Sequence, residues 1–230
     1  MPDVAANLRT LREDIRSVAS ACGRNAAEIR ILAVSKTVEV ARIREALGEG
    51  QTCFGENRVQ EAEPKIRELA PERPSWHLIG PLQANKARRA VELFDVIQTV
   101  DRPRIARRLS ELALELKEKP LPVFIQVNVG DESQKHGVSG GEAAELAQLV
   151  DSLEGLELLG LMSIPPCEED PEASRPYFRE MAGLLGRLNR NRAGPLRQLS
   201  MGMSHDYRVA VQEGATLIRV GTALFGRRSR

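Results

Sequence analysis

The sequence predicts a single (β/α)8 barrel of the TIM type, an α/β fold, with an extra helix at its N-terminus. The chain has 230 residues, which is enough for one large domain with a buried core. Eight short apolar runs recur along it, and amphipathic segments with apolar residues three to four positions apart separate them. This alternation is typical of parallel strands joined by helices, and eight units of about 25 residues favour a closed barrel. We expect residues 1–230 to form one domain.

The predicted elements follow one another in a regular order. An opening helix is expected at about residues 3–21. Strands are expected at residues 30–36, 52–56, 76–80, 95–100, 122–129, 157–164, 198–202 and 216–221. Helical patterns are clearest at 38–50, 102–119 and 141–155, and residues 165–176 are expected to form a loop. Because the run at 52–56 is short and has polar neighbours, a seven-stranded open sheet is the alternative.

Composition and charge favour a small-molecule ligand over a macromolecular one. The 33 basic and 32 acidic residues give a net charge of +1, so no long-range field favours nucleic acid or an anionic membrane. Cys22, Cys53 and Cys167 form an odd set without metal-site spacing, which argues against disulfides and a structural zinc site. The chain carries no apolar signal segment and no apolar run long enough to span a membrane. We expect a cytoplasmic protein.

Polar residues follow several of the predicted strands, where the active sites of parallel barrels form. Lys36 is expected to end the first strand, Asn57 to follow the second, Asn128 to end the fifth and Ser163 to close the sixth. A lysine is unusual at the end of so apolar a strand. Loss of water favours its neutral amine, which attacks aldehydes to form an imine. The alternative is a lysine that reaches solvent or pairs with Glu56.

The ends of the seventh and eighth strands are suited to a phosphate group. Barrels of this type often bind phosphate there through backbone N–H groups. SMGMSHD at 200–206 places Gly202 where the backbone can approach an anion, and Ser204 or Asp206 could cap the next helix. RVGT at 219–222 adds Gly221 and then Thr222 at a helix start. A lysine on the first strand and a phosphate site opposite it would bracket a phosphorylated aldehyde, and pyridoxal 5′-phosphate is such a molecule.

Ordered motifs along nearly the whole chain resemble the pyridoxal phosphate homeostasis protein family, also called the proline synthetase co-transcribed family. They are AVSKT (33–37), FGENRVQE (54–61), WHLIGPLQANK (76–86), QVNVGDESQKHG (126–137), GLMSIP (160–165), SMGMSHD (200–206) and IRVGTALFG (218–226). The resemblance implies a barrel related to the N-terminal domain of alanine racemase, with pyridoxal 5′-phosphate as a Schiff base on Lys36. It also implies phosphate or ring contacts from Asn57, Ser200, Gly202, Met203, Ser204, Gly221 and Thr222.

The resemblance also bears on whether the protein is an enzyme. It implies that Arg219 faces the pyridine nitrogen, where a guanidinium donates a hydrogen bond but does not support ring protonation, so carbanion chemistry is weakly assisted. Racemases of this fold use a tyrosine from a second domain, and neither Tyr177 nor Tyr207 matches it. We expect a monomeric, non-catalytic carrier or regulator that contacts cofactor-free pyridoxal phosphate enzymes transiently. The alternatives are a pyridoxal-phosphate-dependent amino-acid racemase and a cofactor-free Schiff-base aldolase that uses Lys36.

The remaining candidates are interpreted as structural or solvated residues. His77 lies within a predicted strand and is expected to be a core residue. His136 and His205 lie far apart in the sequence without a helical partner, so no metal site is expected. Lys135 could receive the aldehyde from Lys36, but a lysine in a polar loop is usually solvated. Lys86 and Arg88 in NKARR are expected to be solvated on a helix, and a contact with phosphate or a partner is the alternative.

Overall fold

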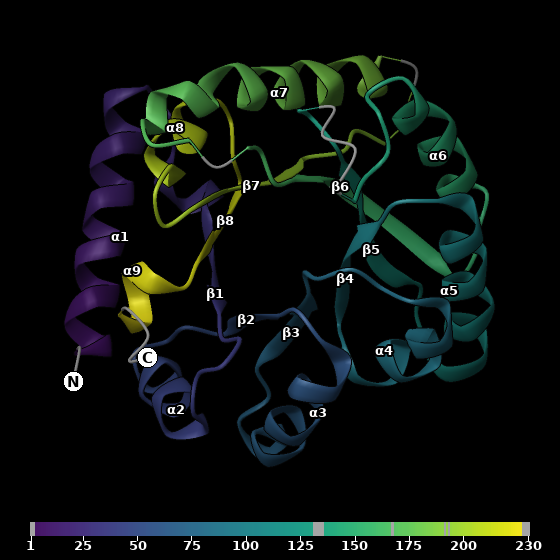
Figure 1. Ribbon diagram of the computed structural model, residues 1–230, viewed down its shortest axis with the longest axis horizontal. Helices are drawn as coiled ribbons and strands as arrows, with labels where there is room; N and C mark the ends of the chain where they lie inside the picture. Colours follow the sequence, from purple (N-terminus) through teal and green to yellow (C-terminus); the bar gives the residue numbers. More distant parts are fainter. Residues whose placement is uncertain (1–2, 131–135, 167, 191, 193, 227–230) are drawn as a thin grey trace.

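Eight parallel strands form a closed barrel in the computed structural model, which describes residues 3–130, 136–166, 168–190, 192 and 194–226 (Figure 1). Their order around the barrel is β1 to β8 in sequence, and β8 closes the ring against β1. The predicted (β/α)8 fold and its N-terminal helix are confirmed, and the alternative of a seven-stranded open sheet is wrong. That residues 1–230 form a single domain stays a prediction.

Each predicted run overlaps one strand. The strands are β1 (Arg30–Val34), β2 (Cys53–Glu56), β3 (Ser75–Leu78), β4 (Val96–Val100), β5 (Leu121–Val127), β6 (Leu156–Ser163), β7 (Gln198–Met203) and β8 (Leu217–Val220). One difference from the prediction concerns Lys36. Strand β1 ends at Val34, so the prediction that Lys36 ends the strand is wrong. The Ser35 carbonyl accepts a hydrogen bond from the N–H of Val38 at 2.9 Å, which starts a turn in place of extended backbone. In the same way, β5 ends one residue before Asn128.

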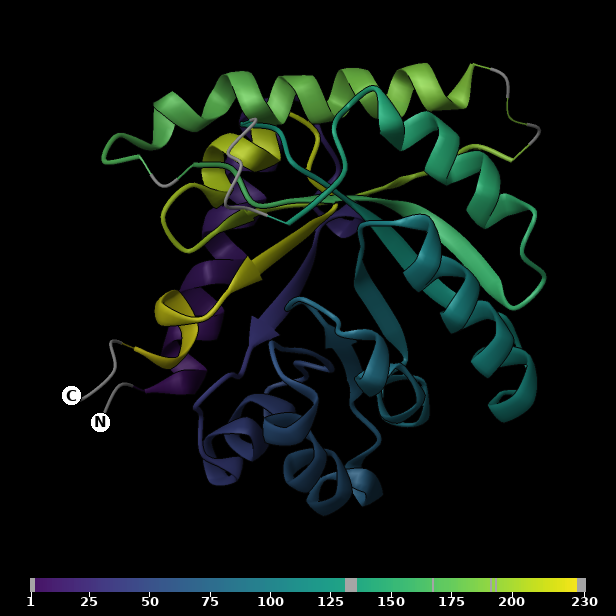
Figure 2. The ribbon, with the colours of Figure 1, turned by 45° about the vertical axis from the view of Figure 1, so that its right-hand side comes forward.

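Helices surround the barrel on its outer side (Figures 1 and 2). The α-helices are α1 (Val4–Ala21), α2 (Val40–Gly48), α3 (Val59–Glu68), α4 (Ala87–Leu93), α5 (Pro103–Leu116), α6 (Glu142–Asp151), α7 (Arg175–Asn189), α8 (Tyr207–Gln212) and α9 (Thr222–Phe225). Short 3-10 helices are η1 (Ala26–Glu28), η2 (Ala70–Glu72), η3 (Ala84–Lys86) and η4 (Pro171–Ser174). None of the helices in the described ranges is long and apolar enough to cross a membrane.

Side chains alternate between the two sides of the barrel wall, as the pleat of a strand requires. Those that point outward pack with the helices into one large core. A second, smaller cluster takes its residues from six different places around the barrel and therefore fills the interior; it consists of Leu32, Ile79, Val96, Phe124, Met162 and Leu217. Residues two positions away along the same strand share this inward direction. The interior is thus apolar in one layer, and the next layer is available for polar groups.

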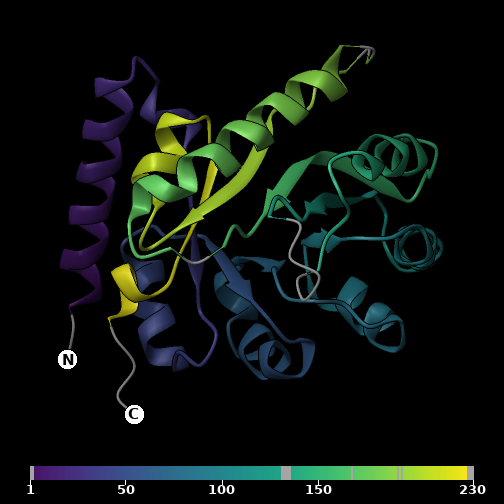
Figure 3. The same ribbon diagram turned by 45° about the horizontal axis from the view of Figure 1, so that its top comes forward.

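The N-terminal helix packs against the last two helices of the chain (Figure 3). The Nδ2 of Asn7 on α1 donates to the carbonyl of Leu224 on α9 at 2.9 Å. The hydroxyl of Tyr207 on α8 donates to Asp14 on α1 at 2.6 Å, and Arg208 donates to the same carboxylate at 2.8 Å. Helix α1 therefore braces the segments that follow β7 and β8.

Candidate functional site

Lys36 lies in a turn at the carboxyl end of β1. It is half-buried, and its amine makes no hydrogen bond or ion pair with any residue in the described part of the chain. The next residue, Thr37, has φ 63°, a left-handed conformation that is unfavourable for a β-branched side chain. Val34 packs at the edge of the interior cluster, and Lys36 follows it by two positions. Side chains two positions apart point to the same side of a strand, so Lys36 is directed toward the mouth of the barrel.

Glu56 does not pair with Lys36, so that alternative is wrong. Its carboxylate is fully buried on the outer side of β2, where its Oε1 accepts from Lys65 Nζ of α3 at 2.8 Å. The same oxygen accepts from the Ser35 hydroxyl at 2.7 Å. Lys65 Nζ also donates to the Ser35 carbonyl at 2.7 Å. Lys65 therefore pairs with Oε1 of Glu56, while Oε2 is buried without a partner among the described residues. The amine of Lys36 takes no part in this pair.

The loops that follow β7 and β8 are joined through Ser204. Its hydroxyl oxygen accepts from the backbone N–H groups of Gly221 at 3.3 Å and of Ala223 at 3.2 Å. Asp206 occupies the N-cap position of α8, but its carboxylate accepts from the N–H of Met203 at 2.6 Å and not from an N–H of the helix. Neither Ser204 nor Asp206 is thus a side-chain cap of α8, contrary to the expectation. Their hydrogen bonds shape one continuous rim from two loops.

Gly202 sits where this rim bends. Its φ of 89° is in the left-handed region, which glycine adopts without strain. A Cβ at this position would lie 2.5 Å from the Cβ of Ala210 on α8. The close approach of the strand end to α8 therefore requires glycine. Gly221 and Thr222 follow β8 directly, and β8 pairs with β1 so that the rim lies beside the strand that leads to Lys36.

Arg219 is buried in the barrel interior below this rim. Its Nη1 donates to the carbonyl and the hydroxyl of Ser200 at 2.7 and 2.8 Å, and its Nη2 donates to the carbonyl of Ser163 at 2.6 Å. No ion pair of this guanidinium is found among the described residues, and burial lowers the pKa of Arg219 to about 10. It stays charged at neutral pH and can only donate hydrogen bonds.

A chain of hydrogen bonds continues from Arg219 across the interior. The Ser200 hydroxyl donates to Oε1 of Gln98 at 2.6 Å, and Nε2 of Gln98 lies 2.8 Å from Nδ1 of His77. Because Oε1 of Gln98 is the acceptor, its Nε2 must donate, and Nδ1 of His77 accepts. Burial, with a smaller effect from the charge of Arg30, lowers the pKa of His77 to about 3. His77 is therefore a neutral core residue.

Two further polar residues lie near the mouth. Asn57 follows β2, is half-buried, and has no side-chain partner within the described ranges. A Cβ on Gly80 would lie 2.1 Å from the Asn57 carbonyl oxygen, so glycine permits the loop after β3 to pack here. Gln126 of β5 donates to the His136 carbonyl at 3.0 Å, while its Oε1 is buried without a partner in the part that the structure describes.

Gln98, Gln126 and Lys65 are not among the site residues predicted from the sequence. The two glutamines carried a signal, since each is a polar residue at an inward position of an otherwise apolar run. Lys65 carried none, because a lysine on an amphipathic helix looks like any solvated residue. Ser200, which was grouped with the phosphate loop, is fully buried and bonded to Arg219 and Gln98.

Other predicted candidates lie away from the mouth. Tyr207 is bonded to Asp14 at the α1–α8 contact, and Tyr177 packs against the outer core from α7. No group of three or more metal-ligating side chains occurs in the described residues. Lys135 falls outside the described residues.

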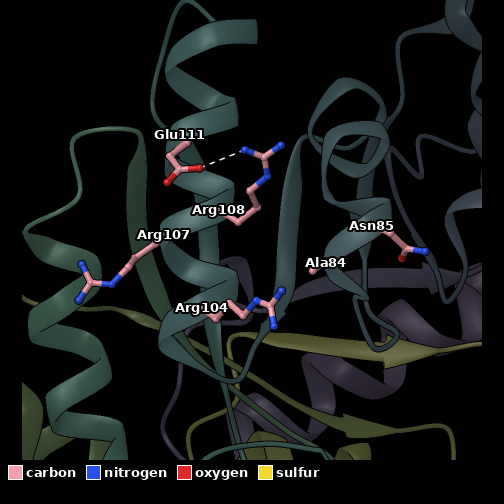
Figure 4. A pocket seen from close by; sticks show the side chains of 6 residues that line it. All are labelled: Ala84, Asn85, Arg104, Arg107, Arg108 and Glu111. Carbon is pink, nitrogen blue, oxygen red and sulfur yellow. Dashed lines mark hydrogen bonds and ion pairs between the residues drawn. The ribbon is translucent and has the colours of Figure 1, made fainter.

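A surface cleft of about 510 Å³ lies between η3 and α5, on the outside of the barrel (Figure 4). It is lined by Ala84, Asn85, Arg104, Arg107, Arg108 and Glu111. Arg108 pairs with Glu111 at 3.0 Å across one turn of α5, and Arg107 points away from η3 (Figure 4). None of the residues at the barrel mouth contributes to this cleft, so it is separate from the candidate site.

Comparisons with known proteins agree with this architecture. The family model of the alanine racemase N-terminal domain matches residues 6–229. The pyridoxal phosphate homeostasis protein of Escherichia coli is 44% identical over 231 residues, covering 99% of this chain and 98% of that protein. Its counterpart in Vibrio alginolyticus is 42% identical over 232 residues and 99% of both chains. The solved structure of PipY from Synechococcus elongatus with PLP bound has a TM-score of 0.85 and 37% identity, covering 97% of this chain and 100% of that one. The chain therefore belongs to the pyridoxal phosphate homeostasis protein family.

Proposed function

We propose that this chain binds pyridoxal 5′-phosphate at the mouth of its barrel and acts in pyridoxal phosphate homeostasis as a carrier or regulator. The observation that carries the proposal is the half-buried amine of Lys36, which has no partner among the described residues, near the rim that Ser204 forms with the backbone N–H groups of Gly221 and Ala223. The family name of its relatives and the PLP-bound structure of PipY support it. Lys36 forms a Schiff base with the aldehyde and releases one water molecule.

The residues present fit such a ligand. The phosphate needs backbone donors that side chains do not block. Glycine at position 202 lets the end of β7 pack closely on α8, since a Cβ there would lie 2.5 Å from the Cβ of Ala210, and this packing shapes the loop after β7. Met203, Ser204, Gly221 and Thr222 complete the rim that would hold the phosphate. In the described part of the chain, the side-chain amide of Asn57 has no partner and is available to the ring, and Oε1 of Gln126 is buried without a hydrogen-bond donor.

Arg219 would face the ring nitrogen. Ser200 would hold the guanidinium of Arg219 in place by accepting its hydrogen bonds. Bound pyridoxal 5′-phosphate supplies an electron sink to amino-acid chemistry, most effectively when its ring nitrogen is protonated. Arg219 has no proton acceptor and remains charged at neutral pH, so it donates to that nitrogen and does not support its protonation. Neither tyrosine of the chain lies at the mouth to act as a second acid or base. Both facts support a non-catalytic role.

The setting of this role is also a proposal. We place the protein in the cytoplasm as a monomer, with the cofactor as its small-molecule ligand. Cofactor-free pyridoxal phosphate enzymes are its transient partners, to which reversal of the Schiff base would deliver the aldehyde. Loaded protein should restore the activity of an aminotransferase stripped of its cofactor. Borohydride reduction fixes the bond at Lys36 and should abolish this transfer; equal transfer before and after reduction would contradict a role for the reversible tether.

Visible absorption tests the binding proposal. Addition of pyridoxal 5′-phosphate should turn the wild-type protein yellow, and Lys36→Ala should abolish this absorption while the fold is retained. Lys86→Ala is the matched control, because Lys86 is a lysine outside the proposed site and should leave the absorption unchanged. A wild-type protein that stays colourless in excess ligand would refute the proposal.

Proton exchange tests the absence of catalysis. Single-enantiomer alanine incubated with loaded protein in deuterated water should show no solvent exchange at its α-carbon beyond the rate with free pyridoxal 5′-phosphate. Exchange at an enzymatic rate would identify a racemase-type activity and contradict the non-catalytic role.

A further inference from the structure

The buried pair of Glu56 and Lys65 has no role in the ligand contacts proposed above. The side chain of Glu56 is fully buried, and that of Lys65 is 13% exposed. Removing two charges from water is costly, and a buried ion pair is often no more stabilising than two apolar residues of similar size. Stability alone is therefore a weak reason for this pair. Its contacts indicate a more specific role.

All these contacts converge on Ser35, the residue before Lys36. The Ser35 hydroxyl donates to Glu56, and its carbonyl accepts from Lys65 Nζ at 2.7 Å and from the N–H of Val38 at 2.9 Å. Its own N–H donates to the carbonyl of Gly55 at 3.0 Å. Every polar group of Ser35 is thus engaged, and two of these bonds depend on the buried pair.

Fixing the Ser35 carbonyl fixes the chain at Lys36. The carbonyl belongs to the same rigid peptide plane as the backbone nitrogen of Lys36. On the other side of Lys36, Thr37 holds a left-handed φ of 63°. Such a conformation persists only where neighbouring contacts determine it, and the bonds of Ser35 supply those contacts on one side of the turn.

We propose that Glu56 and Lys65 are positioning residues that hold the turn at Ser35 and thereby aim the amine of Lys36 at the bound aldehyde. The inference rests on the proposed function and extends it to two residues on the outer side of the barrel wall. A held amine meets the aldehyde at a high effective concentration, which favours Schiff base formation. The rim around Gly202 and Ser204 does not depend on this pair.

The test separates Schiff base formation from binding of the rest of the ligand. The main variant is Glu56→Gln with Lys65→Met, which removes both charges together and leaves no unpaired buried ion. Glu63→Gln is the matched control, because it removes ion pairs to Arg67 and Arg89 from the same helix without touching Ser35. Two probes are used: pyridoxal 5′-phosphate, followed by absorption, and pyridoxine 5′-phosphate, which lacks the aldehyde and is followed by calorimetry.

The double variant should lower the equilibrium constant for Schiff base formation by about tenfold, the effect of one hydrogen bond to a charged group. Its affinity for pyridoxine 5′-phosphate should stay within about twofold of wild type, and Glu63→Gln should change neither quantity. An unchanged Schiff base constant in the folded double variant overturns the inference. An equal loss for both ligands also overturns it, since it would show a general structural role.

If the double variant does not fold, Ser35→Ala carries the test. It removes the hydroxyl bond to Glu56 and leaves the bond from Lys65 to the backbone carbonyl, so we expect a loss of about threefold for the Schiff base alone. An unchanged constant in that variant overturns the inference. A wild-type protein that forms no Schiff base is a different outcome, because it defeats the proposed function itself.

Discussion

His77 should make the protein less stable below pH 6.5. The imidazole is buried, its Nδ1 accepts from Gln98 at 2.8 Å, and burial lowers its pKa from 6.5 to about 3. In the unfolded chain the imidazole takes up a proton as the pH falls through 6.5, whereas in the folded protein it stays neutral until about pH 3. The unfolded state therefore binds more protons in this window. As a result, the free energy of unfolding decreases as the pH is lowered.

The size of the effect follows from the pKa difference. Each pH unit within the window is worth about 1.4 kcal/mol for a single group. A pH of 5 is about 1.5 units below the pKa of the imidazole in the unfolded chain. Protonation of His77 should therefore lower the free energy of unfolding at pH 5 by about 2 kcal/mol relative to pH 7.5. This is a large part of the stability of an ordinary domain.

Urea unfolding of matched variants isolates this contribution from that of the carboxylates. In His77→Asn, the side-chain oxygen replaces Nδ1 as the acceptor for Gln98 and does not titrate. Its loss of stability between pH 7.5 and pH 5 should be about 2 kcal/mol smaller than that of wild type. His205→Asn is the matched control for a change from histidine to asparagine, since His205 is exposed. An identical loss in wild type and His77→Asn would show that the His77 imidazole does not account for the pH dependence.

Three substitutions test other parts of the structure by urea unfolding. Gln98→Leu should cost about 2–4 kcal/mol, because it leaves the Ser200 hydroxyl without its acceptor and the imidazole without its donor; a cost below 1 kcal/mol would contradict the chain of bonds. Thr37→Asn should stabilise the protein by about 0.5 kcal/mol, since asparagine tolerates a positive φ; a loss would show that the turn needs threonine. Gly202→Ala should cost about 2–4 kcal/mol through its positive φ and the contact with Ala210, and should weaken ligand binding; wild-type stability would contradict the close approach.

The barrel was predictable because its signal is repeated along the chain. Each strand run is short and apolar and is followed by a helical pattern, so an error at one end of a strand does not change the fold. The position of Lys36 was less predictable. A turn with φ 63° at a threonine has no sequence signal, because such turns usually carry glycine or asparagine. The bonds from Glu56 and Lys65 that hold this turn depend on how α3 packs against β1 and β2. The sequence pattern does not specify that packing.

The interior network shows the same limit. A glutamine at an inward position of an apolar strand, as at Gln98, indicates a buried polar group that needs partners. Which partners it finds depends on closure of the barrel, since the Ser200 hydroxyl that bonds to Gln98 is 102 residues away in the sequence. The motif resemblance placed Ser200 with the phosphate loop because it is adjacent in sequence, but alternation along β7 turns it into the interior.

Mapping the reduced adduct shows directly whether Lys36 is the lysine that holds pyridoxal 5′-phosphate. Protein loaded with pyridoxal 5′-phosphate is treated with borohydride, digested and analysed by mass spectrometry. We expect one ligand per chain, attached to Lys36 at the turn after β1, with Lys65 unmodified because its amine is bonded to Glu56 and Ser35. A stoichiometric adduct on any other lysine, with Lys36 unmodified, would contradict it.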